Sequence, residues 1–145
     1  MQSAFYRQHG QRYETVVPNA FLGSFEMDLA AIRKSGLLEE IEIKTTTSDL
    51  KKDFDKQSRG GTLKHDQLKA GKMPCNYFSF LVPEGMAFDS IPEYAGIYTC
   101  VEKKWGFRVT TIRPPRLLHK AKVGAETKYQ LARKMVFRYW QGGEP

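Results

Sequence analysis

Three charged residues of this chain have the types and the spacing for hydrolytic chemistry. Asp28 lies in a segment where apolar and polar residues alternate, and Glu42 and Lys44 flank Ile43 in a second such segment. Strand side chains switch faces with a period of two, so Glu42 and Lys44 share a face if the second segment is a strand. Two carboxylates suit a hard divalent cation, and an ammonium suits the charge beside an attacking water. This combination matches what metal-dependent hydrolysis of a phosphodiester requires.

Two strands joined by a tight turn are predicted to position these residues. Residues 25–29 and 40–44 alternate in polarity, and residues 34–36 (Lys-Ser-Gly) form a turn signal between them. Asp28 should point away from its two apolar neighbours, and the charged residues of the second strand should point away from its isoleucines. If the apolar faces of both strands share one core, the three charges converge.

Further helices and strands are predicted along the rest of the chain. Ser48 or Asp49 is expected to cap a helix that places Leu50 and Phe54 on one face. The other predicted elements are a helix or arm over residues 4–12, a strand over 15–17 that Pro18 stops, a helix over 62–70, a buried strand over 77–82, strands over 97–101 and 107–112, and a helix over 125–140 whose Leu131, Met135, Val136 and Tyr139 face inward.

This order of elements predicts an α/β (α+β) fold with a mixed central sheet flanked by helices. The hairpin supplies antiparallel strands, and the helical crossover before residues 77–82 supplies parallel ones, so we expect about four to six strands in one sheet. The chain has 145 residues. That length suits one core and is short for two, so residues 1–145 are predicted to form a single domain.

Composition narrows the class of protein and its partners. The chain carries 23 Lys and Arg against 16 Asp and Glu, and the net charge of +7 favours a polyanionic partner, nucleic acid ahead of a membrane surface. No apolar stretch approaches the roughly 20 residues that span a bilayer, and no signal-peptide core is evident, so we expect a cytoplasmic protein. Cys75 and Cys100 lack metal-ligand spacing and are expected to be reduced core thiols.

The order of the charged residues and elements resembles the PD-(D/E)XK nuclease superfamily. Asp28 would lie in one strand and Glu42-Ile43-Lys44 in the next, followed by a crossover helix and another strand. The chain is most similar to small bacterial and phage single-domain members. The likeness covers roughly residues 14 to 120, and it departs from the family pattern where Met27 replaces the proline before Asp28. The matching segments are residues 41–53, 64–65, 76–85 and 92–97.

The resemblance implies a restriction-endonuclease-like core, Mg²⁺ or Mn²⁺ as cofactor, and hydrolysis of nucleic-acid phosphodiester bonds. DNA is the expected substrate, in repair, recombination or phage DNA processing. Asp28, Glu42 and Lys44 would be catalytic, with Asp28, Glu42 and the Ile43 carbonyl holding the metal and Lys44 orienting the attacking water.

Further roles are expected for residues outside the motif. Glu14 is the candidate for the family's upstream acidic metal ligand, and Glu26 is the second choice. Lys51, Lys52, Arg59, Lys64 and His65 are the candidates for nucleic-acid binding, against the alternative that they form an ordinary solvated surface.

Two other functions fit the same sequence. The first is a catalytically inactive nuclease-fold protein that binds nucleic acid or serves as an accessory factor. The second is a phage-encoded protein that binds a host protein. Competent side chains at all three motif positions favour the nuclease, because a degenerate site is expected to have lost one of them. A homodimer in a bacterial or phage-infected cell is compatible with each of these functions.

Overall fold

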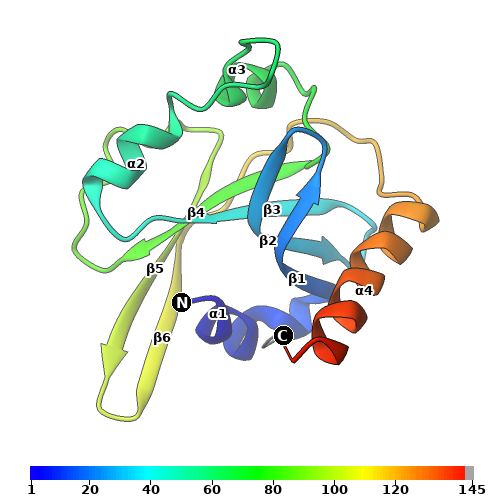
Figure 1. Ribbon diagram of the computed structural model, residues 1–145. Coiled ribbons are helices and arrows are strands. Elements are labelled where there is room, and N and C mark those ends of the chain that lie inside the picture. The colour runs from blue at the N-terminus through cyan, green and yellow to red at the C-terminus, as the bar shows by residue number, and fades with distance from the viewer. Residues whose placement is uncertain (143–145) are drawn as a thin grey trace.

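A six-stranded mixed sheet forms the centre of the computed structural model, which describes residues 1–142 (Figure 1). Strands β1 to β3 form an antiparallel meander, β3, β4 and β5 run parallel, and β6 returns antiparallel to β5. The order across the sheet follows the chain. The strands are β1 (Tyr13–Leu22), β2 (Phe25–Arg33), β3 (Leu38–Ile43), β4 (Tyr77–Pro83), β5 (Gly96–Lys103) and β6 (Gly106–Arg113).

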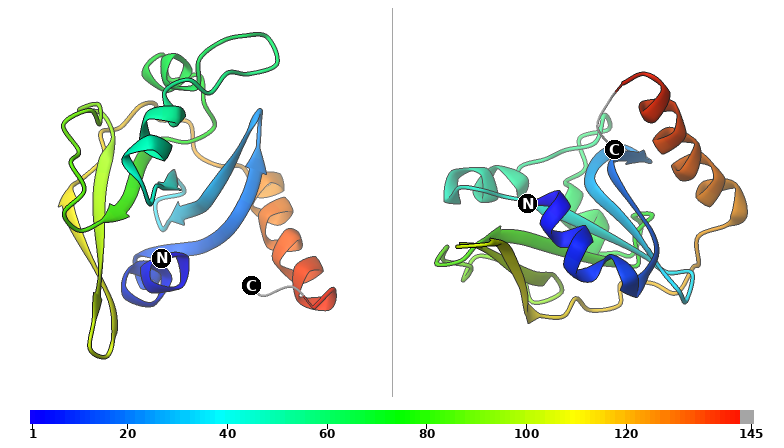
Figure 2. Two further views of the ribbon diagram at one scale, coloured as in Figure 1. Left: turned by 60° about the vertical axis from the view of Figure 1, so that its left-hand side comes forward. Right: turned by 90° about the horizontal axis from the view of Figure 1, so that it is seen from below.

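Helices cover both faces of this sheet (Figure 2). Helix α1 (Gln2–His9), which continues into a 3-10 turn at Gly10–Arg12, lies on one face, whereas α2 (Thr47–Asp53) and α3 (Lys64–Lys69) lie on the other and connect β3 to β4. Helix α4 (Ala125–Trp140) packs at the β1 edge. The predicted mixed sheet flanked by helices is therefore confirmed. None of the helices within residues 1–142 is long and apolar enough to cross a bilayer.

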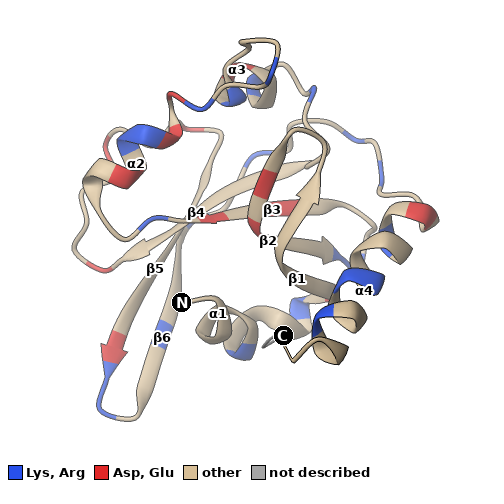
Figure 3. Ribbon diagram, in the orientation of Figure 1, with Lys and Arg blue, Asp and Glu red and all other residues tan. Residues whose placement is uncertain are grey.

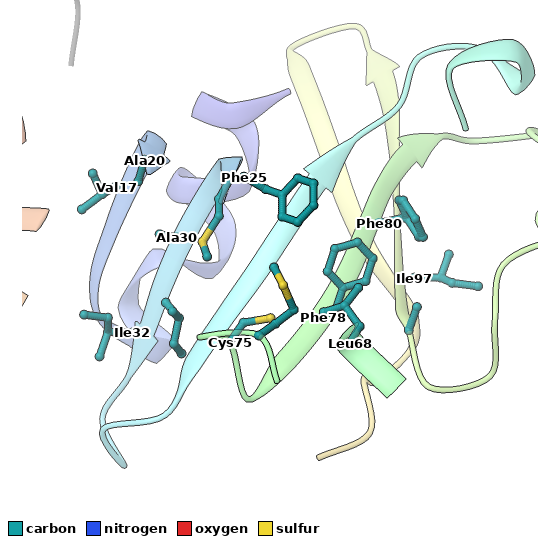
Figure 4. Packing of buried hydrophobic residues seen from close by; sticks show 14 of the residues in the cluster. Val17, Ala20, Phe25, Ala30, Ile32, Leu68, Cys75, Phe78, Phe80 and Ile97 are labelled. Atoms are coloured by element: carbon teal, nitrogen blue, oxygen red, sulfur yellow. The ribbon is translucent and has the colours of Figure 1, made fainter. Parts of the chain in front are cut away.

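Two apolar clusters hold the helices to the sheet. The cluster under α2 and α3 contains Leu50, Leu68, Phe78 and Phe80, and Figure 4 shows the last three packed between the helical crossover and the strands. The cluster under α1 contains Phe5 among others. Because both faces of β3 and β4 are covered, polar residues of β3 are buried as deeply as its apolar ones. Because of this double coverage, the charged side chains of β3 in the candidate site are buried.

The structure corrects several predicted boundaries. Strand β1 runs through Pro18 to Leu22 instead of stopping at residue 17, because β1 is an edge strand where a missing backbone N–H leaves no ladder bond unmade. Thr46, and neither Ser48 nor Asp49, caps α2: its hydroxyl accepts a hydrogen bond from the Asp49 N–H at 3.1 Å. Helix α1 ends at His9, three residues earlier than predicted, and α3 begins at Lys64 rather than residue 62.

The C-terminal helix has the predicted bounds but a narrower buried face. Leu131 is fully buried and Met135 is partly buried, whereas Val136 is 57% exposed and Tyr139 is 67% exposed. The prediction that Val136 and Tyr139 face inward was wrong. Helix α4 packs mainly against a single edge strand, which is too narrow to cover a wide apolar stripe.

Candidate functional site

Strands β2 and β3 diverge at Asp28, and the divergence opens the candidate site. The last paired residues of the β2–β3 ladder are Leu29 and Ile41. Beyond them Asp28 Oδ2 accepts a hydrogen bond from the backbone N–H of Ile43 at 2.7 Å. The carboxylate therefore replaces a ladder hydrogen bond where the strands separate, and it lies against the end of β3.

Side-chain alternation in β2 breaks at the same residue. Met27 belongs to the apolar cluster under α2 and α3, whereas Leu29 belongs to the cluster under α1. Across the hairpin, Asn19 adopts φ +49°, a left-handed conformation that Asn tolerates better than most residues. The prediction that Asp28 points away from both apolar neighbours is corrected, because these neighbours lie on opposite faces.

Glu42 is at the centre of the site and binds three ammonium groups. Its carboxylate is 2% exposed. Lys64 Nζ lies 3.0 Å from Oε1, and Lys44 Nζ and Lys56 Nζ each lie 3.1 Å from Oε2. Glu42 and Lys44 thus share one face of the chain at the end of β3, as their spacing predicts.

Asp53 in α2 belongs to this network, and the sequence analysis missed it. The side chain is fully buried, and its Oδ1 lies 2.9 Å from Lys44 Nζ and 2.8 Å from Lys56 Nζ. Neither ammonium is aligned for a hydrogen bond, so Oδ1 is a buried acceptor without a partner within the described residues. Helical spacing is the signal that could have found it, since Asp53 follows buried Leu50 by three residues.

His65 and Tyr94 extend the network under α3. His65 Nε2 lies 2.7 Å from Asp53 Oδ2, and Nδ1 contacts the Tyr94 hydroxyl. Burial alone would raise the pKa of Asp53, but the hydrogen bond from His65, together with Lys64 and Lys56, outweighs burial and lowers the pKa. Since Asp53 is ionised, His65 donates from Nε2. His65 is 6% exposed, so it does not have the free surface expected of a phosphate-binding residue.

Lys64 also differs from its predicted role in nucleic-acid binding. Its side chain is fully buried and forms ion pairs with Glu40 and Glu42. Burial lowers the pKa of Lys64, but the two glutamates and Asp53 outweigh that effect and raise it. Burial raises the pKa of Glu40 to about 7 even though Lys64 opposes the shift. Lys64 is a buried counterion of the glutamates, and no phosphate can reach it in this conformation.

The surroundings raise the pKa of both Asp28 and Lys44, but for different reasons. Burial, followed by the nearby charge of Glu42, raises the pKa of Asp28. Burial opposes the charge on Lys44, but Asp53 and Glu42 outweigh it and raise its pKa. In Glu42 itself, the three ammoniums overcome burial and lower the pKa. Lys44 is thus a stable cation, and Asp28 and Glu42 repel each other.

A cavity of about 370 Å³ opens onto these groups. Glu26 lines it, whereas Glu14 does not: Glu14 is ion-paired to Lys128 at 3.0 Å. The choice of Glu14 over Glu26 as the upstream acid is corrected accordingly. Lys51, Lys52 and Arg59 are exposed, and Lys52 also lines the cavity. The lining residues are Glu26, Asp28, Glu42, Ile43, Lys44, Asp49, Lys52, Asp53 and Lys56.

The donor types of this cavity suit a hard divalent cation. No group of three or more His, Cys, Asp or Glu side chains is arranged to hold a metal among residues 1–142. Mg²⁺, however, commonly takes one or two carboxylates and completes its shell with water and substrate oxygens. The mutual repulsion of Asp28 and Glu42 favours a cation between them. The residues fit such an ion provided that Lys44 and Lys56 release Glu42 Oε2.

Comparison with known proteins supports the fold alone. No protein-family model and no curated protein matches the sequence. Among solved structures, the chain is similar to SPO1766, a protein of unknown function from Silicibacter pomeroyi, with a TM-score of 0.63 and 12% sequence identity. The alignment covers 97% of this chain and 84% of that one. At this identity the similarity extends to the arrangement of the sheet and helices.

Proposed function

We propose that this protein is a metal-dependent nuclease of the PD-(D/E)XK type. One observation supports the proposal above all: Asp28, Glu42 and Lys44 meet in one cavity, where β2 and β3 diverge. The elements around them also follow the expected order, with Asp28 on β2, Glu42 on β3, a helical crossover and the parallel strand β4. A solvated strand face, the ordinary explanation for alternating charges, does not fit side chains that are as buried as Glu42.

Each residue has a role that follows from its surroundings. Asp28, Glu42 and the Ile43 carbonyl would hold Mg²⁺ or Mn²⁺, which supplies Lewis-acid polarisation and a more acidic bound water. The Asp28 side chain is oriented by its bond to the Ile43 N–H, so the carboxylate faces the end of β3. Glu26 lines the same cavity and is the better candidate for the additional acidic ligand.

Lys44 is proposed to act as a fixed cation. Asp53 and Glu42 raise its pKa, so the ammonium stabilises negative charge that develops on the phosphate during attack by water. Asp53 orients Lys44 through a contact of 2.9 Å. Because Asp53 is itself held by His65, the position of Lys44 depends on a hydrogen-bond network that extends to Tyr94.

A nucleic acid is the substrate that best suits the charge of the chain. The net charge is +7, Lys52 of α2 lines the cavity, and Lys51 and Arg59 are exposed nearby in the sequence. Such lysines neutralise phosphates without reading sequence. We propose DNA as the substrate, in repair, recombination or phage DNA processing.

A non-catalytic nucleic-acid-binding protein is the second candidate, and the ion pairs of Glu42 favour it. Both oxygens of this carboxylate are occupied by ammoniums, so the network is neutralised without a metal. In that case the buried charges would serve the fold alone. The two candidates differ in whether a divalent cation displaces Lys44 and Lys56 from Glu42.

Cleavage assays distinguish the two candidates. End-labelled linear, single-stranded, flapped and branched DNA, together with RNA, would be incubated with Mg²⁺ or Mn²⁺ and with wild type, Asp28→Asn or Lys44→Ala. We expect metal-dependent cutting by wild type, reduced on the order of a hundredfold in each variant because each removes a preorganised electrostatic group. Asp28→Asn keeps the lysine cluster intact, and Glu102→Gln, at an exposed site on β5, is the control. Binding without cutting by wild type would favour the second candidate.

A further inference from the structure

A second cavity, which shares no lining residue with the candidate active site, lies between the β1–β2 hairpin and helix α4. Its volume is about 380 Å³. Phe21 of β1 and Phe137 of α4 line it and are 54% and 61% exposed. Arg133, Lys134 and Arg138 of α4 also line it, and no carboxylate does. We call this cavity, defined by these five residues with Asn19 and Gln130, the α4 groove.

The positive charge of the α4 groove is not compensated. Lys134 Nζ donates to the Phe21 carbonyl at 2.9 Å, and Arg138 donates to the carbonyls of Pro18 and Asn19. These bonds fix α4 against the hairpin, but a carbonyl carries no net charge. Arg133 has no hydrogen-bond or ion-pair partner among residues 1–142. Figure 3 shows Lys and Arg recurring along α4, and Glu126 in the first turn is its only acidic residue.

The groove adjoins the candidate active site through one side chain. Asn19 lines the groove, and Asp28 lines the active-site cavity. The Gln2 amide nitrogen donates to Asn19 Oδ1 at 3.1 Å and to the Asp28 carbonyl at 2.9 Å. Asn19 and Asp28 also face each other across the hairpin, between the pairs Pro18–Leu29 and Ala20–Met27. A ligand in the groove would therefore reach Asn19, which faces Asp28 across the hairpin, and Asp28 is a residue that we assign to the metal.

We infer that the α4 groove binds a single strand of nucleic acid that leads to or from the active site. The inference rests on the proposed function for the identity of the substrate. Exposed aromatic rings stack on bases of any sequence, and uncompensated cations follow the phosphates. Phe21 and Phe137 supply the rings, and Arg133, which has no partner among residues 1–142, supplies a cation. A binding role would also explain why only a narrow face of α4 is buried, because aromatic residues outside that face stay available to a ligand.

Two other occupants fit the groove less well. A membrane surface would favour a continuous apolar face with lysines at its border, whereas here the cations alternate with the aromatic rings inside the groove. An apolar protein segment would leave three cations of the groove without acidic partners. A strand of nucleic acid can stack its bases on the rings and place its phosphates beside the cations.

Binding to short fluorescein-labelled single-stranded DNA and RNA tests this inference. The measurement is fluorescence anisotropy in EDTA with the full chain, so that it does not depend on hydrolysis. The variants are Phe137→Ala and Arg133→Gln, both at exposed positions that leave the core intact. The matched controls are Tyr129→Ala, an exposed α4 aromatic residue outside the groove, and Lys120→Gln, an exposed cation elsewhere.

We expect Phe137→Ala to weaken binding roughly tenfold, as the loss of one stacked base does. Arg133→Gln should lower the slope of log affinity against log salt by about 0.7, the value for one phosphate contact on a single strand. The controls should bind as wild type does. Equal binding by wild type and both groove variants would overturn the inference and leave the proposed nuclease untouched.

Two further outcomes separate this inference from the proposed function. If wild type binds neither DNA nor RNA in any form, the proposed function fails together with the groove. If the groove variants lose binding to phosphatidylserine vesicles while oligonucleotide binding is unchanged, the groove is a membrane site and the inference is overturned.

Discussion

His65 Nε2 lies 2.7 Å from Asp53 Oδ2, and this contact joins α3 to α2 beneath the candidate active site. Asp53 in turn contacts Lys44, the cation of the proposed catalytic motif. His65 is therefore two contacts away from Lys44, through Asp53. Its side chain positions a carboxylate and takes no direct part in binding the substrate.

Replacing His65 with alanine should destabilise the protein and disturb Lys44. Asp53 is fully buried and would lose its aligned donor, while Lys44 and Lys56 still offset its charge, so the expected cost is that of a lost hydrogen bond to a charged group, about 1.5 to 3 kcal/mol. Urea denaturation measures the change in the free energy of unfolding. An unchanged midpoint in His65→Ala would contradict the role assigned to this contact. Asp66→Asn, at the exposed neighbouring position on α3, is the control and should unfold close to wild type.

Glu40 should make the protein less stable as the pH rises from 4.5 to about 7. Burial raises its pKa to about 7 in the folded state, above the ordinary value of 4.5. Between these two values the folded state holds a proton that the unfolded state has lost, so the free energy of unfolding falls with increasing pH. A separate effect comes from Asp53, whose lowered pKa contributes stability that is lost as the pH falls below about 4.

Glu40→Gln should remove the loss of stability with rising pH that Glu40 causes. The variant is neutral at every pH, so its stability relative to wild type should increase from pH 4.5 to 7 by a few kcal/mol, at 1.36 kcal/mol per pKa unit. Urea denaturation at several pH values measures this difference in the free energy of unfolding, with Glu102→Gln as the exposed control. Parallel stability curves for Glu40→Gln and wild type would contradict the raised pKa.

Glu26→Gln and Glu14→Gln should have sharply different effects on metal-dependent cleavage. Glu26 lines the active-site cavity, so Glu26→Gln should reduce metal-dependent cleavage, on the order of tenfold or more if it helps to hold the cation. Glu14 forms an exposed ion pair with Lys128, so Glu14→Gln should change stability by less than about 1 kcal/mol and leave cleavage unchanged. Cleavage and thermal unfolding of both variants provide the comparison. Loss of cleavage only in Glu14→Gln would reverse the assignment.

The sequence predicted the strands of the site far better than its buried charges. Alternation and the turn at residues 34–36 predicted the β2–β3 hairpin, and the spacing of Glu42 and Lys44 predicted their shared face. The same alternation suggests a solvated polar face. Nothing local reveals that α2 and α3 cover that face, so Glu40 was not singled out and Lys64 was assigned to the surface.

Long-range contacts explain most of the remaining errors. Lys64 meets Glu42 across 22 residues of sequence, and the two come together because α3 lies over β3 in the crossover that leads to β4. Position along the strands alone does not indicate that Glu26 lines the cavity whereas Glu14 pairs with Lys128. Helical spacing did contain the missing information on Asp53, since a polar residue three positions after a buried leucine falls on the same buried face.

Lys64→Met should be strongly destabilising, and a second substitution should rescue part of the loss. The ammonium is fully buried between Glu40 and Glu42, and its removal leaves two carboxylates close together, at a cost of about 3 to 5 kcal/mol. Adding Glu40→Gln removes one of those carboxylates. Glu42 keeps Lys44 and Lys56, so the double variant should be more stable than Lys64→Met alone. A double-mutant cycle by urea denaturation measures the coupling, and strict additivity of the two changes would mean that Lys64 does not act as the counterion of Glu40.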